Sequence, residues 1–220
     1  MVARLMGQKT ETHIWGVFTL AAILLGLNGC ASMSEQECLA ADWRLVGYED
    51  ATQGRNASTI SAHRKACARI NVVPDLDRYQ QGYREGARQY CVRPTAYQLG
   101  INGGKYEGIC PADLEPAFLR AYRDGQALYA ITRNIEDQQD SLRSYQSDIA
   151  GYQQEIAQHE LDIIDPASTA NERRDHLRAL EKLRRKIADA EIEITHIERN
   201  INNLQFDYRD LQQHHQRLGY

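Results

Sequence analysis

A heptad repeat of apolar residues occupies much of the C-terminal half of this 220-residue chain. One position of the repeat recurs every seven residues and holds only Leu and Ile: Leu128, Ile135, Leu142, Ile149, Ile156 and Ile163. The alternate position holds Ile131, Gln138, Tyr145, Tyr152 and His159. Two such seam positions in every seven residues, sustained over five repeats, are typical of a coiled-coil helix.

A break near Pro166 divides this pattern into two helices. Proline lacks the backbone N–H that a helix interior needs, and Thr169 with Glu172 has the spacing of a capping box that starts a new helix. From Leu180 the apolar spacing of three and four residues resumes and runs to Leu218. We therefore predict an antiparallel coiled-coil hairpin over residues 131–220, with its turn near 165–169.

The charges on the two predicted helices are complementary. Residues 131–165 hold eight acidic and two basic side chains, whereas residues 173–186 hold seven Arg and Lys side chains against two acidic ones. Equal seam lengths on either side of the turn would place Ile149 opposite Ile187. Complementary flanking charges set partner and orientation in coiled coils, which favours pairing within one chain. An intermolecular coiled coil or other homo-oligomer remains the open alternative.

The first thirty residues have the layout of a signal for export. Arg4 and Lys9 form a basic lead, and a mostly apolar run follows over residues 14–27. As a helix, that run would reach about 21 Å, which is short of the roughly 30 Å hydrocarbon core and favours a cleaved signal. The tetrapeptide at residues 27–30 (LNGC) resembles the lipobox of bacterial lipoproteins.

This resemblance implies that residues 1–29 are a cleaved signal peptide and that Cys30 is lipidated. Acyl chains such as palmitate would form part of that lipid. Residues 30–34 would then be a lipidated tether, and three acyl chains anchor a protein stably. The absence of Asp directly after Cys30 favours sorting to the outer membrane. We expect a lipid-anchored, periplasm-facing protein in the outer membrane of a Gram-negative bacterium. An ordinary signal peptide is the alternative.

The four remaining cysteines are Cys38, Cys67, Cys91 and Cys110. An even number of cysteines in an exported chain predicts two disulfide bonds, with three connectivities. We favour the sequential pairing, Cys38 with Cys67 and Cys91 with Cys110, because it closes two short independent loops. Neither pair has the C-x2–4-C spacing of a structural zinc site.

Residues 35–130 form a predicted small helical domain that is rich in Cys, Tyr and Gly. Two segments in it, Tyr79–Tyr90 and Phe118–Tyr129, share a pattern of aromatic and small residues. Such spacing puts the aromatic rings on one helix face, and we interpret the two helices as packing together in a core. A sugar- or peptide-binding groove is the alternative. Its candidate residues are Trp43, Tyr48, Tyr79, Tyr83, Tyr106 and Tyr122.

An ordered series of residues in this region resembles a known family. The series comprises Cys38, Asp42-Trp43, Gly47-Tyr48, Gly54, His63, Cys67, Pro74-Asp75, Tyr79, Gly82, Gly86, Tyr90-Cys91, Tyr106, Gly108, Cys110-Pro111, Tyr122 and Gly125. It is similar to the uncharacterised bacterial lipoproteins of domain-of-unknown-function family 2799, over about residues 35–130. The resemblance implies export, lipidation and disulfides, and it implies no activity.

No motif in the chain predicts catalysis. G-x-S-x-G and H-E-x-x-H are absent, and the glycine-rich loop at 99–106 departs from P-loop spacing. Acid pairs such as Glu49 and Asp50 are interpreted as solvated or capping residues. The net charge of −4 gives no reason to expect nucleic acid as a partner. We expect no cofactor.

Two histidines flank the predicted turn of the hairpin. His159 and His176 both fall on seam positions and are weak candidates for a metal site or a pH-sensitive contact. The simpler interpretation is that both are polar residues tolerated near the end of the hairpin.

These features predict a mainly α protein, with a small disulfide-bonded helical domain followed by a long antiparallel hairpin. The function they favour is that of a non-enzymatic envelope lipoprotein, a structural or interaction module whose arm reaches a protein partner or peptidoglycan. One alternative is a module that binds glycan or peptidoglycan fragments through its Tyr/Trp-rich domain. A second is an unrecognised envelope hydrolase.

Overall fold

The structure is a computed structural model that describes residues 32–220, so the predicted signal peptide and Cys30 lie outside the described residues. The described part of the chain is helical and contains no strand, which confirms the predicted fold class. It forms two compact units, the first ending at Ala87 and the second comprising Arg88–Tyr220. Among the described helices, none is long and apolar enough to cross a membrane.

The first unit is built from short helices. These are α2 (Glu35–Ala40), α3 (Trp43–Thr52), α4 (Ile60–Cys67) and all but the last three residues of α5 (Leu76–Tyr90), with 3-10 turns at Ala57–Thr59 and Ala68–Ile70. A capping box between Ser34 and Glu37 starts α2, and the Asp42 carboxylate accepts the Arg44 backbone N–H to start α3. Each cap satisfies backbone donors that the first turn of a helix leaves open.

Both disulfides follow the predicted sequential pairing. Cys38 bonds to Cys67 within the first unit, and Cys91 bonds to Cys110 within the second. The four sulfur-bearing residues are buried. With sequence separations of 29 and 19 residues, each bond stabilises its unit by about 3–4 kcal/mol in the loop-entropy model.

Glycines bring helices α3 and α5 into backbone contact. A Cβ atom added at Gly82 would lie 1.7 Å from the carbonyl oxygen of Arg44, and one added at Gly47 would lie 2.1 Å from that of Tyr79. Both distances are far below any van der Waals contact. The small residues between the aromatic positions of α5 therefore serve close packing, as the spacing predicted.

The second unit uses the same device. Helix α6 (Arg93–Ile101) packs against the start of α7 (Glu115–Ile164). A Cβ added at Gly100 would lie 2.3 Å from the Tyr122 carbonyl oxygen, and one added at Gly125 would lie 2.4 Å from that of Tyr97.

The two similar segments therefore differ from their predicted arrangement. Tyr79 and Phe118, which occupy equivalent places in the pattern, lie in two separate hydrophobic clusters. Each glycine-containing helix packs against a short helix that precedes it in its own unit. Helix α7 runs without a break from Glu115 through the predicted boundary at residue 130 into the arm.

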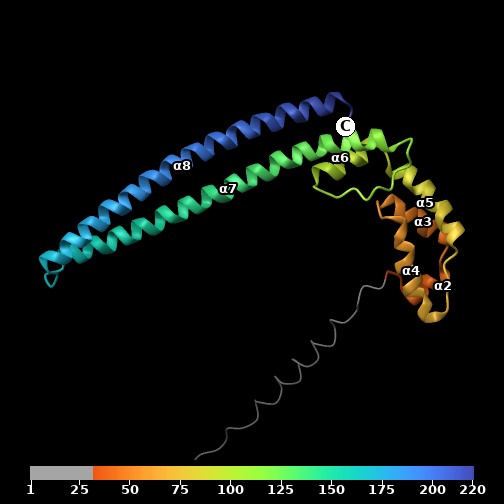
Figure 1. The fold of residues 1–220 in the computed structure, drawn as a ribbon, viewed down its shortest axis with the longest axis horizontal. Helices are drawn as coiled ribbons and strands as arrows, with labels where there is room; N and C mark the ends of the chain where they lie inside the picture. Colours follow the sequence, from red (N-terminus) through yellow and green to blue (C-terminus); the bar gives the residue numbers. More distant parts are fainter. Residues whose placement is uncertain (1–31) are drawn as a thin grey trace, which may run out of the picture. The chain divides into compact units, whose positions relative to one another are not determined.

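Helices α7 and α8 (Ala170–Arg217) form the predicted hairpin. They contain 50 and 48 residues, run antiparallel and lie side by side, joined at one end by a short turn (Figure 1). The turn occupies residues 165–169, and Thr169 with Glu172 makes the predicted capping box. At 1.5 Å per residue, the arm is about 75 Å long.

The seam of the hairpin is only partly covered. Leu128, Leu180, Leu183, Ala190 and Ile197 are buried, most other seam positions are half-buried, and the flanking positions are exposed. Two helices alone cover one stripe of each other, so this pattern is the one expected of a two-stranded coiled coil.

Aromatic contacts join the far end of α8 to α6. His215 is buried, its Nδ1 atom lies 3.3 Å from the Tyr97 hydroxyl, and its ring meets that of Tyr97 edge-on. The Tyr220 ring stacks on Tyr97 with centroids 4.9 Å apart, and its hydroxyl donates to Asp124 of α7 at 2.8 Å. This cluster of Tyr97, Asp124, His215 and Tyr220, called here the base cluster, closes the hairpin at the end opposite its turn.

The base cluster should make the second unit sensitive to acid. Burial lowers the pKa of His215 below its usual value, with a further contribution from His214, although Asp124 acts in the opposite direction. His215 is therefore neutral in the folded state, and its contribution to stability is complete above pH 6.5. That contribution is lost as the pH falls through the lowered folded-state pKa.

We expect His215→Gln to reduce the decline in unfolding free energy between pH 7 and pH 5, measured by urea denaturation followed by circular dichroism. His196→Gln changes an exposed histidine elsewhere on α8 and should leave the decline close to that of the wild type. Equal pH dependence in His215→Gln and the wild type would contradict this assignment.

Candidate functional site

Buried polar side chains gather in the first unit around Asp50. Asp50 is only 2% exposed, and its carboxylate accepts the Tyr79 hydroxyl at 2.7 Å and faces His63 Nε2 at 2.9 Å. Arg55 donates to its other oxygen at 2.9 Å. An ionised carboxylate offers no proton, so His63 Nε2 carries the hydrogen of its bond. We call Asp50, Arg55, His63 and Tyr79 the Asp50 hub; it joins α3, α4 and α5.

The sequence interpretation of Asp50 as a solvated or capping residue is wrong. Helix α3 buries Trp43, Gly47, Asp50 and Ala51, which follow the spacing of one helix face. Asp50 therefore lies on the core side of α3, where the hub donors compensate for its burial. This helical spacing could have indicated from the sequence that Asp50 faces the core. It was overlooked because charged residues are usually found at the surface.

The hub reaches the surface through Ser32. Its hydroxyl lies 3.2 Å from His63 Nδ1, which completes a line of Ser, His and Asp. These are the residue types of an acyl-transfer nucleophile, base and orienting acid. The Asp50 carboxylate, however, is shared with Tyr79 and Arg55 as well. The arrangement is that of a structural junction between three helices, with Ser32 as an exposed contact.

A cleft of about 330 Å³ lies beside the hub. Its apolar lining comes from Met33, Ala40, Ala41, Leu45 and Val46, and its polar lining includes Glu37, Asp42, Glu49, Asp50, Arg55 and His63. Carboxylates outnumber basic groups in this lining, so the cleft favours cationic over anionic ligands.

Most of the predicted aromatic ligand-binding residues of the first unit are core residues. Trp43 and Tyr79 are buried in the cluster that holds the Cys38–Cys67 disulfide, and Tyr83 packs against it. The Tyr83 hydroxyl donates to the Arg55 carbonyl at 2.7 Å, while Tyr48 is the exposed member of the set. These rings fill the interior instead of lining a groove.

Tyr106 and Tyr122 belong to the second unit and pack there against Phe118. The Tyr106 hydroxyl donates to Glu115 at 3.0 Å, and the Tyr122 hydroxyl donates to the Gly104 carbonyl at 2.8 Å. Burial raises the pKa of Tyr106, as does its bond to Glu115. Five of the six candidate residues are thus divided between two separate cores, and the sixth, Tyr48, is exposed.

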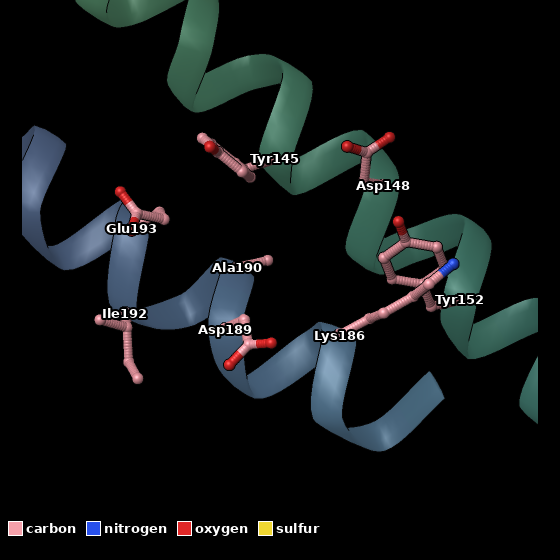
Figure 2. A pocket seen from close by; sticks show the side chains of 8 residues that line it. All are labelled: Tyr145, Asp148, Tyr152, Lys186, Asp189, Ala190, Ile192 and Glu193. Atoms are coloured by element: carbon pink, nitrogen blue, oxygen red, sulfur yellow. The ribbon is translucent and has the colours of Figure 1, made fainter. Parts of the chain in front are cut away.

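A shallow groove lies between α7 and α8, nearer the turn than the opposite end of the hairpin, and Figure 2 shows its lining residues. Its volume is about 380 Å³, and its lining consists of Tyr145, Asp148, Tyr152, Lys186, Asp189, Ala190, Ile192 and Glu193. The Lys186 ammonium lies 4.7 Å from the centre of the Tyr152 ring, a cation–π contact between the two helices. We call this the arm groove. Buried Ala190 leaves space beside the tyrosines.

The structure brings the two predicted seam histidines together at the turn. His159 Nδ1 and His176 Nδ1 lie 2.9 Å apart, and both side chains are partly buried. Asp162, which the sequence interpretation missed, joins them, with Oδ2 3.9 Å from His176 Nδ1. Its place three residues after His159 puts both on one helix face, which was the available signal.

The described part of the chain includes residues that match a known family. The family described as "Protein of unknown function (DUF2799)" matches residues 42–127. The match covers the Asp50 hub, helix α6 and the first turns of α7, whereas the remainder of the arm follows it. No curated protein and no solved structure matches the chain significantly.

Proposed function

We propose that this chain, whose residues 42–127 match the DUF2799 family as the ordered Cys, Trp and Gly-Tyr series predicted, is a non-enzymatic interaction module of the bacterial cell envelope. In this proposal Cys30 is lipidated and holds the protein at the outer membrane, facing the periplasm. The arm carries the binding surface for a partner. Glycan binding at the first unit and envelope hydrolysis are the alternative functions.

The arm is the observation that carries this proposal. Within the second unit, α6 packs along the first turns of α7, and the rest of α7 pairs with α8. A hairpin about 75 Å long exceeds what is needed to complete the small core at its base. Its flanks are exposed and charged over most of that length. Long arms of this kind present binding surfaces at a distance from an anchor.

The arm groove is the surface that we assign to the partner. Asp148, Asp189 and Glu193 line it with three carboxylates, and its one lysine is engaged with Tyr152. The tyrosine rings supply apolar contact area together with hydroxyl groups. This chemistry is complementary to a basic segment of a protein partner, and we commit to that class of occupant.

A photo-crosslinking residue at Ile192, an exposed position of the groove rim, should capture a protein of discrete mass in living cells. The double charge reversal Asp148→Lys with Asp189→Lys should reduce this adduct by about tenfold or more, since like charges across an interface cost several kcal/mol. The matched control, Asp140→Lys with Glu198→Lys, changes exposed acids on the same helices outside the groove.

A second variant removes the groove without altering the ends of the arm. Deletion of residues 142–155 with 182–195 takes two heptads from each helix, which keeps the seam in phase and shortens the arm by about 21 Å. Because this deletion removes Ile192, the crosslinking residue is placed at the turn instead. We expect the shortened arm to capture no protein partner from that position. Adducts that survive both variants, or adducts to muropeptides alone, would contradict a protein partner at the groove.

A further inference from the structure

We propose that the turn of the hairpin binds one divalent metal ion of the zinc class, held by His159, Asp162 and His176. The ion would join α7 to α8 at the end of the arm. This inference rests on the side chains at the turn and does not depend on the proposed partner.

The three ligand atoms already converge. The Nδ1 atoms of His159 and His176 are 2.9 Å apart, and all three candidate atoms lie within 4.8 Å of one another. Tetrahedral zinc with bonds of about 2.0–2.1 Å places its ligand atoms about 3.3 Å apart. The two nitrogens must therefore separate by a few tenths of an ångström, and Asp162 Oδ2 must move toward His176 from 3.9 Å.

Neighbouring groups orient Asp162 for this role. Gln158 donates to its Oδ1 atom at 2.9 Å, which leaves Oδ2 as the oxygen that faces His176. The Ser168 hydroxyl donates to the Asp162 backbone carbonyl at 2.6 Å and ties the turn to the end of α7. Hydrogen bonds of this kind to ligating side chains are usual around protein metal sites.

The ligand set selects the class of metal. Two imidazoles and one carboxylate suit zinc and neighbouring divalent transition metals, whereas calcium and magnesium prefer oxygen ligands alone. Three protein ligands leave a fourth position for water, the composition of an open zinc site.

Some charged groups around the turn favour a bound metal cation and others oppose it. Glu172 interacts electrostatically with His176, and the bonds from Thr169 hold the pKa of Glu172 low, so the carboxylate is ionised beside the site. Arg173 opposes a bound cation, although its guanidinium donates to the Asp165 carbonyl at 3.2 Å. Asp162 and Glu172 thus outnumber the nearby arginine.

The test is a zinc titration of the full-length protein in detergent, after chelator treatment, in competition with a chromophoric chelator. The wild type should bind one Zn²⁺ per chain at this site. His159→Ala and His176→Ala should each weaken that binding by about 100-fold or more, and Asp162→Asn and Gln158→Ala by about tenfold. His196→Ala removes an exposed histidine elsewhere on α8 and should have no effect.

A structural readout accompanies the titration. Zinc should slow amide hydrogen exchange near residues 159–176 in the wild type and in His196→Ala, and leave it unchanged in His176→Gln. Circular dichroism checks that each variant keeps its helix content. Equal zinc affinity in the wild type and the double variant His159→Ala/His176→Ala would overturn the proposal. Protection confined to other histidines would overturn it as well.

Discussion

Asp50→Ala should lower the unfolding free energy of the first unit by about 3–5 kcal/mol. The substitution removes the acceptor of three hydrogen bonds and leaves the His63 and Tyr79 donors without it in the interior. An unsatisfied buried donor costs more than the net value of the bond that it made. Trp43 is buried in the same unit, so its fluorescence during urea denaturation measures the change.

Two further substitutions distinguish the stabilising effect of the buried Asp50 carboxylate from that of the exposed Ser32 hydroxyl. Ser32→Ala removes only the exposed hydroxyl that contacts His63, and should change the unfolding free energy by less than about 0.5 kcal/mol. Asp50→Asn keeps an acceptor oxygen and should fall between the other two. A loss below about 1 kcal/mol in Asp50→Ala would contradict the role of the hub.

Gly82→Ala should destabilise the first unit by about 3 kcal/mol or more, because overpacking against backbone has no soft partner to yield. The added methyl group would meet the Arg44 carbonyl oxygen at 1.7 Å, so α3 and α5 would have to separate. That separation would disturb the packing of Tyr79 between them. Trp43 fluorescence again measures the change.

The same substitution should have the opposite sign in the arm. At Gly151 an added Cβ meets nothing within 4 Å, and the residue lies inside helix α7. Gly151→Ala should therefore stabilise the arm by about 0.5–1 kcal/mol, through the better helix propensity of alanine. Equal effects of Gly82→Ala and Gly151→Ala on thermal unfolding would refute the close-packing argument.

The arm could be predicted from the sequence because its determinants are local. Heptad spacing, Pro166 and the Thr169–Glu172 capping box all act within a few residues of each other, and the structure confirms each one. The disulfide pairing was also predictable, since four cysteines leave few connectivities and short loops are the simplest choice.

The interior of the first unit could not be predicted in the same way. Whether Asp50 is solvated or buried depends on which face of α3 meets α5, and that contact joins residues about thirty positions apart. The tyrosine pattern likewise predicted helix faces correctly but not which helix each face would meet. To predict that Asp162 lies beside the two histidines at the turn, one needs the register of α7 against α8. The heptad periodicity gives that register only approximately.

The base cluster gives the arm a mechanical property. A pull applied at the turn travels along both helix axes in parallel, so each helix carries about half of the load. At the opposite end α7 is held by α6, while α8 is held through His215 and the stacked rings of Tyr97 and Tyr220. Tension would therefore reach the second unit through two separate attachments, so neither attachment alone would carry the whole load.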